Sequence, residues 1–195
     1  MIPEQVAYIS IFTSLFAGYF YIRDTLKGGT KPNRVSWFMW FIAPMIASTI
    51  VFQSGSIVSF VPVFMSGFVP FLVFLVSFKN KNAYWKLDKL DYFCLFLSLC
   101  ALISWIFLKE GLLATIFAIL ADGIAFFPTY LKSWEAPDTE TVGPYISGTF
   151  NGLLSLFTAG ILGFNIIGFA IYLFFGNLVE IAIILYRRRK ISKIS

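Results

Sequence analysis

Residues 35–78 read VSWFMWFIAPMIASTIVFQSGSIVSFVPVFMSGFVPFLVFLVSF and contain no charged side chain. A helix that crosses a bilayer needs roughly 20 mostly apolar residues, so this stretch is about twice the length of one crossing. The polar segment QSGS at 53–56 interrupts it near the middle and is expected to form a very short turn. The stretch therefore predicts two membrane-spanning helices that are joined at one surface of the bilayer.

The rest of the chain has the same apolar character. Of the 195 residues, 58% are hydrophobic, 24 are Phe and only 13% are charged. A soluble domain could not hide this much apolar surface in its interior. No basic stretch precedes the first apolar run and no small-residue cleavage site follows it, so we expect a retained helix rather than a signal peptide.

Clusters of charged residues divide the chain into seven apolar segments. Each segment is close to the length that a bilayer crossing needs. The sequence therefore predicts an all-α membrane protein with seven transmembrane helices. The expected helices cover residues 6–22, 35–53, 56–78, 92–108, 111–131, 142–158 and 161–186.

Lys and Arg gather in alternate loops, at residues 23–34 and 79–91 and in the tail from 187 onward. Cytoplasmic loops retain basic residues, so the N-terminus is expected outside and the C-terminus in the cytoplasm. The loop 132–141 departs mildly from this pattern because it holds one Lys and three acids. The short loops suit a bacterial inner (plasma) membrane. We interpret the basic tail as an anchor for the anionic lipid bilayer, not as a nucleic-acid site.

Two stretches of the chain match without a gap at an offset of 108 residues. AGYFYIRDTLKGGTKPNRVSW begins at Ala17 and AFFPTYLKSWEAPDTETVGPY begins at Ala125. Each ends an apolar helix with aromatic residues, crosses a polar loop and starts another helix. The match favours two parallel three-helix repeats, since one linker helix lets both repeats point the same way. Chance similarity is the alternative. The expected units are residues 1–78 (first repeat), 79–110 (connector and linker helix four) and 111–195 (second repeat with the basic tail).

The segment PTYLKSWEAPDTETVGP at 128–144 resembles the signature of the PQ-loop superfamily, in which a Pro-Gln pair ends one helix. This superfamily includes the SWEET sugar transporters, the cystinosin-like exporters and the KDEL receptor. The resemblance extends to helix count and to the three-one-three arrangement. Thr129 replaces the glutamine, and Phe20 stands where the second repeat has Pro128, so the chain resembles a divergent member.

The resemblance implies transport by alternating access, with Pro128 as a hinge. A proline inside an apolar helix removes a backbone hydrogen bond and displaces the carbonyl one turn earlier, so the helix is expected to bend there. A plain packing kink is the alternative, because proline often makes one in membrane helices.

Asp122 lies near the middle of the expected fifth helix. An ionisable side chain at mid-bilayer costs about 2.5 to 3.5 kcal/mol, so its default interpretation is a functional group that faces a cavity. It could exchange protons or pair with a cationic solute. The alternative is a protonated Asp that bonds to a neighbouring helix. Glu180 lies about two turns from Arg187 and is expected to reach toward the basic tail.

Asn151, Asn165 and Asn177 are the neutral candidates for solute binding. The string NIIGF from Asn165 is similar to the Asn-x-x-Gly-Phe of SWEET transporters, where the asparagine binds sugar, whereas depth in the bilayer favours Asn177. Hydrogen bonding between helices is the alternative for all three. Trp40 is a candidate wall for the solute, and Trp37 lies where interfacial Trp is expected; a belt or packing role is the alternative for both.

These observations indicate a transporter for a small polar solute such as a sugar, an amino acid or a vitamin-like molecule, with proton coupling through Asp122 as an option. The alternative is a membrane receptor or assembly subunit that does not transport. An enzyme is not expected: the chain has no histidine, and Cys94 and Cys100 would point to different faces of one helix. No cofactor or metal is indicated. The Gly148 and Gly152 spacing permits close helix packing, within the chain or in a homo-oligomer.

Overall fold

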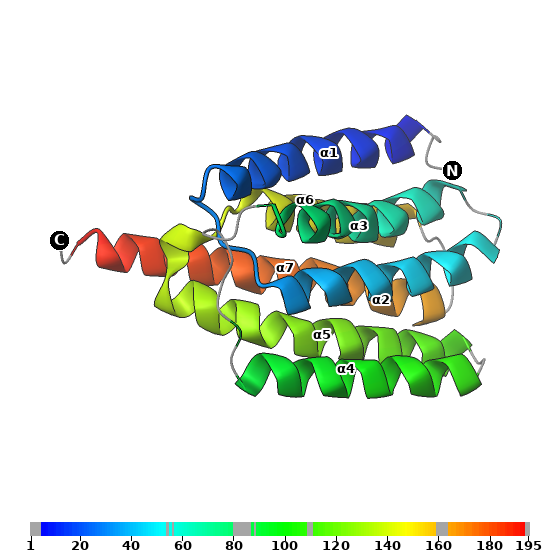
Figure 1. Cartoon of the computed structure of the whole chain (residues 1–195). Helices are drawn as coiled ribbons and strands as arrows, with labels where there is room; N and C mark the ends of the chain where they lie inside the picture. The colour runs from blue at the N-terminus through cyan, green and yellow to red at the C-terminus, as the bar shows by residue number, and fades with distance from the viewer. Residues whose placement is uncertain are drawn as a thin grey trace.

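The computed structural model describes residues 5–53, 55, 57–79, 87, 89–108, 111–158 and 164–193. This part of the chain is all-helical, and seven α-helices lie side by side in it (Figure 1). Helices are present at all seven predicted positions, and their described ends agree with the prediction to within a few residues. They are α1 Gln5–Leu26, α2 Arg34–Gln53, α3 Ile57–Val76, α4 Lys89–Leu108, α5 Gly111–Glu135, α6 Gly143–Thr158 and α7 Phe164–Ile191, with the 3₁₀ helix η2 Pro137–Thr139 between α5 and α6.

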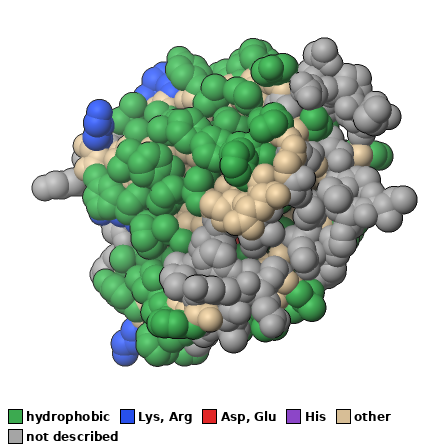
Figure 2. Space-filling model, turned by 90° about the vertical axis from the view of Figure 1, so that its right-hand side faces the viewer, with side chains coloured by type: hydrophobic (Ala, Val, Ile, Leu, Met, Phe, Trp, Pro, Cys, Tyr) green, Lys and Arg blue, Asp and Glu red, His purple; other side chains and the backbone are tan. Residues whose placement is uncertain are grey.

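Four of the described helices are long and apolar enough to cross a membrane. They are α2, α3, the segment Thr115–Glu135 of α5 and the segment Ile167–Ile191 of α7. Large apolar side chains also point outward: Phe12 is 69% exposed and Phe107 is 79% exposed. Hydrophobic side chains dominate the described part of the end-on surface in Figure 2, where Lys and Arg show only at the edge. Apolar surface of this extent is typical of a protein that faces lipid.

The helices are arranged in two groups of three plus one. In the first group, α3 packs against both α1 and α2. In the last group, α7 packs against both α5 and α6. The groups meet where α1 packs on α6, α2 on α5 and α3 on α6, while α4 lies mainly against α5. Six helices thus surround the interior of the bundle.

The two termini lie at opposite ends of the bundle (Figure 1). Every described Lys and Arg lies at the end that holds the C-terminus, which we call the basic end. At the other end, Gly55 connects α2 to α3 with φ of +76°, a left-handed conformation that glycine adopts without strain. The expected turn at 53–56 is therefore present, although Ser54 and Ser56 lie outside the described residues.

Gly148 and Gly152 face α7 of the same chain. A Cβ atom on Gly152 would come within 2.6 Å of the Phe174 amide nitrogen, and one on Gly148 within 2.5 Å of Asn177 Oδ1. Both glycines therefore allow close packing of α6 on α7. This pair serves packing within the chain and gives no argument for a homo-oligomer.

Candidate functional site

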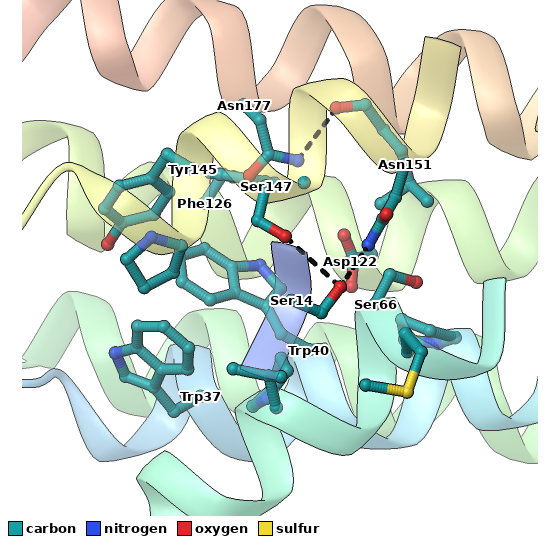
Figure 3. Close-up of a pocket in the computed structure, with 17 residues that line it drawn as sticks. Ser14, Trp37, Trp40, Ser66, Asp122, Phe126, Tyr145, Ser147, Asn151 and Asn177 are labelled. Atoms are coloured by element: carbon teal, nitrogen blue, oxygen red, sulfur yellow. Dashed lines mark hydrogen bonds between the residues drawn. The ribbon is translucent and has the colours of Figure 1, made fainter. Parts of the chain in front are cut away.

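A small cavity of about 50 Å³ lies inside the bundle, partly open to the outside. Side chains from both groups of three helices line it (Figure 3). Four of the residues singled out by the sequence share this cavity, although they come from four different helices. These are Trp40 of α2, Asp122 of α5, Asn151 of α6 and Asn177 of α7.

Two of the candidates are not among the residues that line this cavity. Pro128 is buried within α5. Asn165 lies in the first turn of α7, and its side chain falls outside the described part of the structure. The hinge role of Pro128 and the binding role of Asn165 therefore stay predictions.

Asp122 is 1% exposed, and its two carboxylate oxygens have different surroundings. Oδ2 accepts a hydrogen bond of 2.7 Å from the Tyr172 hydroxyl of α7. Oδ1 is buried and has no hydrogen-bond partner among the described residues. A buried polar atom without a partner carries a desolvation penalty of about 1–3 kcal/mol, more for a charged group, so a ligand or a proton at this oxygen would remove that penalty.

Asn151 ties α6 to α1. Its Oδ1 accepts from Ser10 Oγ at 2.7 Å, and its Nδ2 donates to Ser14 Oγ at 2.8 Å. Ser147 Oγ bonds to the same Ser14 oxygen at 3.2 Å, as Figure 3 shows. Both ends of this amide are satisfied within the protein, so helix-to-helix bonding describes Asn151 better than solute binding does.

Asn177 makes only a local hydrogen bond in the described structure. Its Nδ2 donates to the Leu173 carbonyl, one turn earlier in α7, at 2.8 Å. The absence of a side chain at Gly148 leaves the space that the Asn177 amide occupies. The Asn177 amide therefore packs against Gly148 of α6, and both residues line the cavity.

Aromatic rings form one wall of the cavity. The ring centroid of Trp40 lies 4.4 Å from that of Phe126, 5.2 Å from that of Trp37 and 6.0 Å from that of Tyr145. Trp40 Nε1 has no hydrogen-bond partner in the described chain. Trp37, at the start of α2, is 2% exposed and packs inside the bundle, where its Nε1 donates to the Tyr21 hydroxyl at 3.1 Å.

A buried ionic cluster lies at the basic end. Glu140 accepts hydrogen bonds from the Tyr21 hydroxyl at 2.9 Å and from the Tyr145 hydroxyl at 3.2 Å. The Lys132 ammonium pairs with its other oxygen and also donates to the Lys31 carbonyl. Lys132 and Glu140 have fully buried side chains. We call these residues, Tyr21, Lys132, Glu140 and Tyr145, the Lys132–Glu140 cluster.

The cluster adjoins the cavity directly. Tyr145 belongs to both, and Trp37 lines the cavity while donating to Tyr21 of the cluster. In Figure 3, Trp37 and Tyr145 lie toward one side of the cavity, and Asn151 and Ser66 toward the other. The cluster therefore borders the cavity on the side where Trp37 and Tyr145 lie.

Glu180 does not reach toward the basic tail, so that expectation is wrong. Its side chain is buried, and its Oε1 accepts a hydrogen bond from Ser133 Oγ of α5. The arginines at the end of α7 bond instead to the last turn of α5 and to the segment that follows it. Arg187 Nε donates to the Trp134 carbonyl of α5 at 2.7 Å, and Arg188 donates to the Pro137 and Glu140 carbonyls. Arg188 thus holds the loop that supplies Glu140.

Polar contacts link α5 to α2 beside Pro128. Ser36 Oγ of α2 donates to the Ala125 carbonyl at 2.6 Å. Thr129 Oγ1, next to the proline, donates to Ser36 Oγ at 2.9 Å. Neighbouring hydroxyl groups of this kind stabilise a membrane helix where proline interrupts its bonding. These bonds therefore connect α5 beside Pro128 to α2, which belongs to the other group of helices.

Sequence reasoning missed Ser14, Tyr172 and the Lys132–Glu140 cluster. Single hydroxyl groups in apolar helices are too common to select by type, and Lys132 and Glu140 belong to a segment that looks like an exposed loop. One signal was present for Ser14: it lies 108 residues before Asp122, which is the offset of the predicted repeats.

Comparisons with known proteins leave the function to be argued from this geometry. No family model matches the chain, and no curated protein and no solved structure is significantly similar to it.

Proposed function

We propose that this chain is a transporter that moves a small polar solute across the membrane by alternating access through the central cavity. The observation that carries the proposal is the position of Asp122. A carboxylate with one unpartnered oxygen lies in a cavity between membrane-length helices. Intramembrane carboxylates face solute or ion pathways by default.

The proposed architecture is seven crossings in two parallel repeats, residues 1–78 and 111–195, joined by a linker helix within 79–110. The helix bounds support it: adding 108 to the bounds of α1 (5–26) gives 113–134, inside α5 Gly111–Glu135. The same addition to α3 (57–76) gives 165–184, inside α7 Phe164–Ile191. The packing supports it too, because α3 and α7 are each packed against both other helices of their group. Exchanging the repeats turns the α1–α6 contact into the α5–α2 contact.

The proposed orientation has the basic end in the cytoplasm of a bacterial cell and the N-terminus outside. The positive-inside rule supports this orientation, because all described Lys and Arg residues lie at one end of the bundle. The Lys132–Glu140 cluster then closes the cytoplasmic side. The solute would reach the cavity from outside and leave after the cluster separates.

Pro128 is the proposed hinge, as the resemblance to the PQ-loop superfamily implies for a divergent member. The Ser36 bonds to α5 beside the proline support coupling between the two repeats. Asp122 is the proposed coupling group. It faces the hydroxyl of Tyr172 on α7, and no Lys or Arg lines the cavity within the described residues. A proton and a solute could therefore compete for its free oxygen.

One observation favours the alternative, a membrane receptor or assembly subunit without transport. At the basic end the cavity is bordered by a buried cluster of groups that bond to one another, and a receptor needs only a pocket that opens to one face. Neither proposal assigns a catalytic role to Asp122 or requires a cofactor.

Counterflow separates the two functions. A thermal-shift panel of sugars, amino acids, vitamins and amines on the purified protein would first identify a stabilising solute. Liposomes that contain the protein would then be loaded with that solute and placed in a trace of its labelled form. A transporter accumulates the label transiently above the level of empty liposomes. Binding without accumulation would reject transport and support the receptor.

A further inference from the structure

The described lining of the cavity holds an acidic side chain and no basic one. Asp122 is the only charged side chain among the described residues that line it, and no Lys or Arg is present in that lining. Tyr172, which donates to Oδ2, is a neutral partner. An ionised carboxylate in an interior of low dielectric needs a positive charge nearby, or it binds a proton instead. The cavity is therefore complementary to a cation.

The aromatic wall adds a second feature that suits a cation. Asp122 and Phe126 are four residues apart in α5, so they share one face of the helix. The Trp40 ring lies 4.4 Å from the Phe126 ring, and its indole also lines the cavity. Organic ammonium groups bind to the faces of aromatic rings, and Trp binds them best. Carboxylate and aromatic surfaces are thus presented to the same space.

Several of the polar groups that a polyol would need are already bonded within the chain, although Trp40 Nε1 is an unpartnered donor among the described residues. A sugar needs several donors and acceptors, but both ends of the Asn151 amide are occupied by Ser10 and Ser14. The Asn177 Nδ2 already donates to the Leu173 carbonyl. In contrast, Asp122 Oδ1 has no partner among the described residues, so it can accept from an N–H of a protonated amine, and its charge can pair with any ammonium group.

We infer that the solute of this cavity is a small organic cation, whose ammonium group binds Asp122 Oδ1 and whose carbon atoms pack on Trp40. The inference rests on the proposed function, of which it names the substrate class. Ser14, the counterpart of Asp122 in the other group of helices, is neutral, so one cation per cavity is the expected stoichiometry.

A pair of isosteres tests the charge requirement. Choline and 3,3-dimethylbutan-1-ol have nearly the same shape, but only choline carries a positive charge. Binding of each to the purified protein would be measured by thermal shift and by quenching of Trp fluorescence. Choline is expected to bind at least about tenfold more tightly than the neutral alcohol, because only choline carries the charge that pairs with Asp122 and binds to the aromatic rings. A tenfold difference in Kd corresponds to about 1.4 kcal/mol of binding free energy. Equal binding of the two would overturn the inference.

Variants assign the effect to this cavity. Asp122→Asn keeps an acceptor for Tyr172 but removes the charge, and it is expected to lose choline binding by at least about tenfold. Trp40→Leu is expected to lower the affinity for choline several-fold. The matched control is Asp138→Asn, which removes a carboxylate whose side chain is 79% exposed and which lies outside the cavity lining. Unchanged choline binding in Asp122→Asn, or no binding of choline, tetramethylammonium and butylamine by the intact protein, would also overturn the inference.

Counterflow of labelled choline keeps this inference distinct from the proposed function. Choline that binds through Asp122 but never exchanges across liposomes would support the cation site and reject transport. Counterflow of a neutral sugar that is insensitive to Asp122→Asn would support transport and overturn the cation site.

Discussion

Two buried acidic groups in this molecule have opposite surroundings. Glu140, at the basic end, has both carboxylate oxygens bonded, to Lys132 on one side and to Tyr21 and Tyr145 on the other. Asp122, in the cavity, has one oxygen bonded to Tyr172 and one oxygen without a partner in the described residues. A completed network holds the helices together, whereas an oxygen without a partner is available to a ligand where it lines a cavity. Glu180 Oε2 also has no partner among the described residues, but Glu180 does not line the cavity.

The comparison predicts the largest loss of stability at Glu140. Glu140→Gln leaves the Lys132 ammonium buried without a counter charge, which typically costs about 3–5 kcal/mol. Equilibrium unfolding in mixed detergent micelles would measure the loss. The double variant Lys132→Met and Glu140→Gln removes both charges and should recover much of it. Equal losses in the single and double variants would show that the ion pair is not what stabilises this end.

A middle-sized effect is expected where α6 meets α7. Gly152→Ala would place a Cβ atom 2.6 Å from the Phe174 amide nitrogen and 2.9 Å from the Ala170 carbonyl, both backbone atoms that cannot move aside. Overpacking of this kind costs about 1–3 kcal/mol, which would appear as a lower unfolding temperature. Gly123→Ala is the matched control, because its Cβ would meet Tyr172 at 3.5 Å, an ordinary contact. Equal stability in both variants would contradict this account of the α6–α7 contact.

Gly148→Ala sharpens the comparison at the cavity. The new Cβ would lie 2.5 Å from Asn177 Oδ1, a side-chain atom that can move aside. The expected loss of stability is smaller than for Gly152→Ala, but solute affinity should fall several-fold as Asn177 is displaced. Thermal unfolding and ligand titration of the two variants would show the contrast. A Gly148→Ala protein with full affinity would remove Asn177 from the binding site.

Pro128→Ala is expected to affect movement more than folding or binding. Alanine restores the missing backbone donor within α5, so stability should be retained or slightly improved. If the helix bends at this proline during transport, flux in liposomes should fall several-fold while solute affinity stays the same. Unchanged flux would reject the hinge role and leave Pro128 as a kink that serves helix packing.

The comparison also shows what could be predicted from the sequence. Charge clusters separate the apolar runs, so the seven helices were predicted to within a few residues. Asp122 was found because a lone acid in an apolar run is costly. Glu140 and Lys132 were not, because their segment has the polarity of an exposed loop. Its burial depends on Tyr21, more than 100 residues away, and on Arg188 of α7, which holds the loop. For the same reason, Glu180 was assigned to the wrong partner.

The most direct test of the central claim is solute flux through reconstituted protein as a function of pH, with and without the Asp122 carboxylate. Choline, or the solute that the thermal-shift panel identifies, would be followed into liposomes at several internal and external pH values. The account predicts flux that responds to the pH gradient in the intact protein and loses this response in Asp122→Asn, with little change in unfolding temperature. Unchanged flux with an unchanged pH response in the folded variant would contradict it.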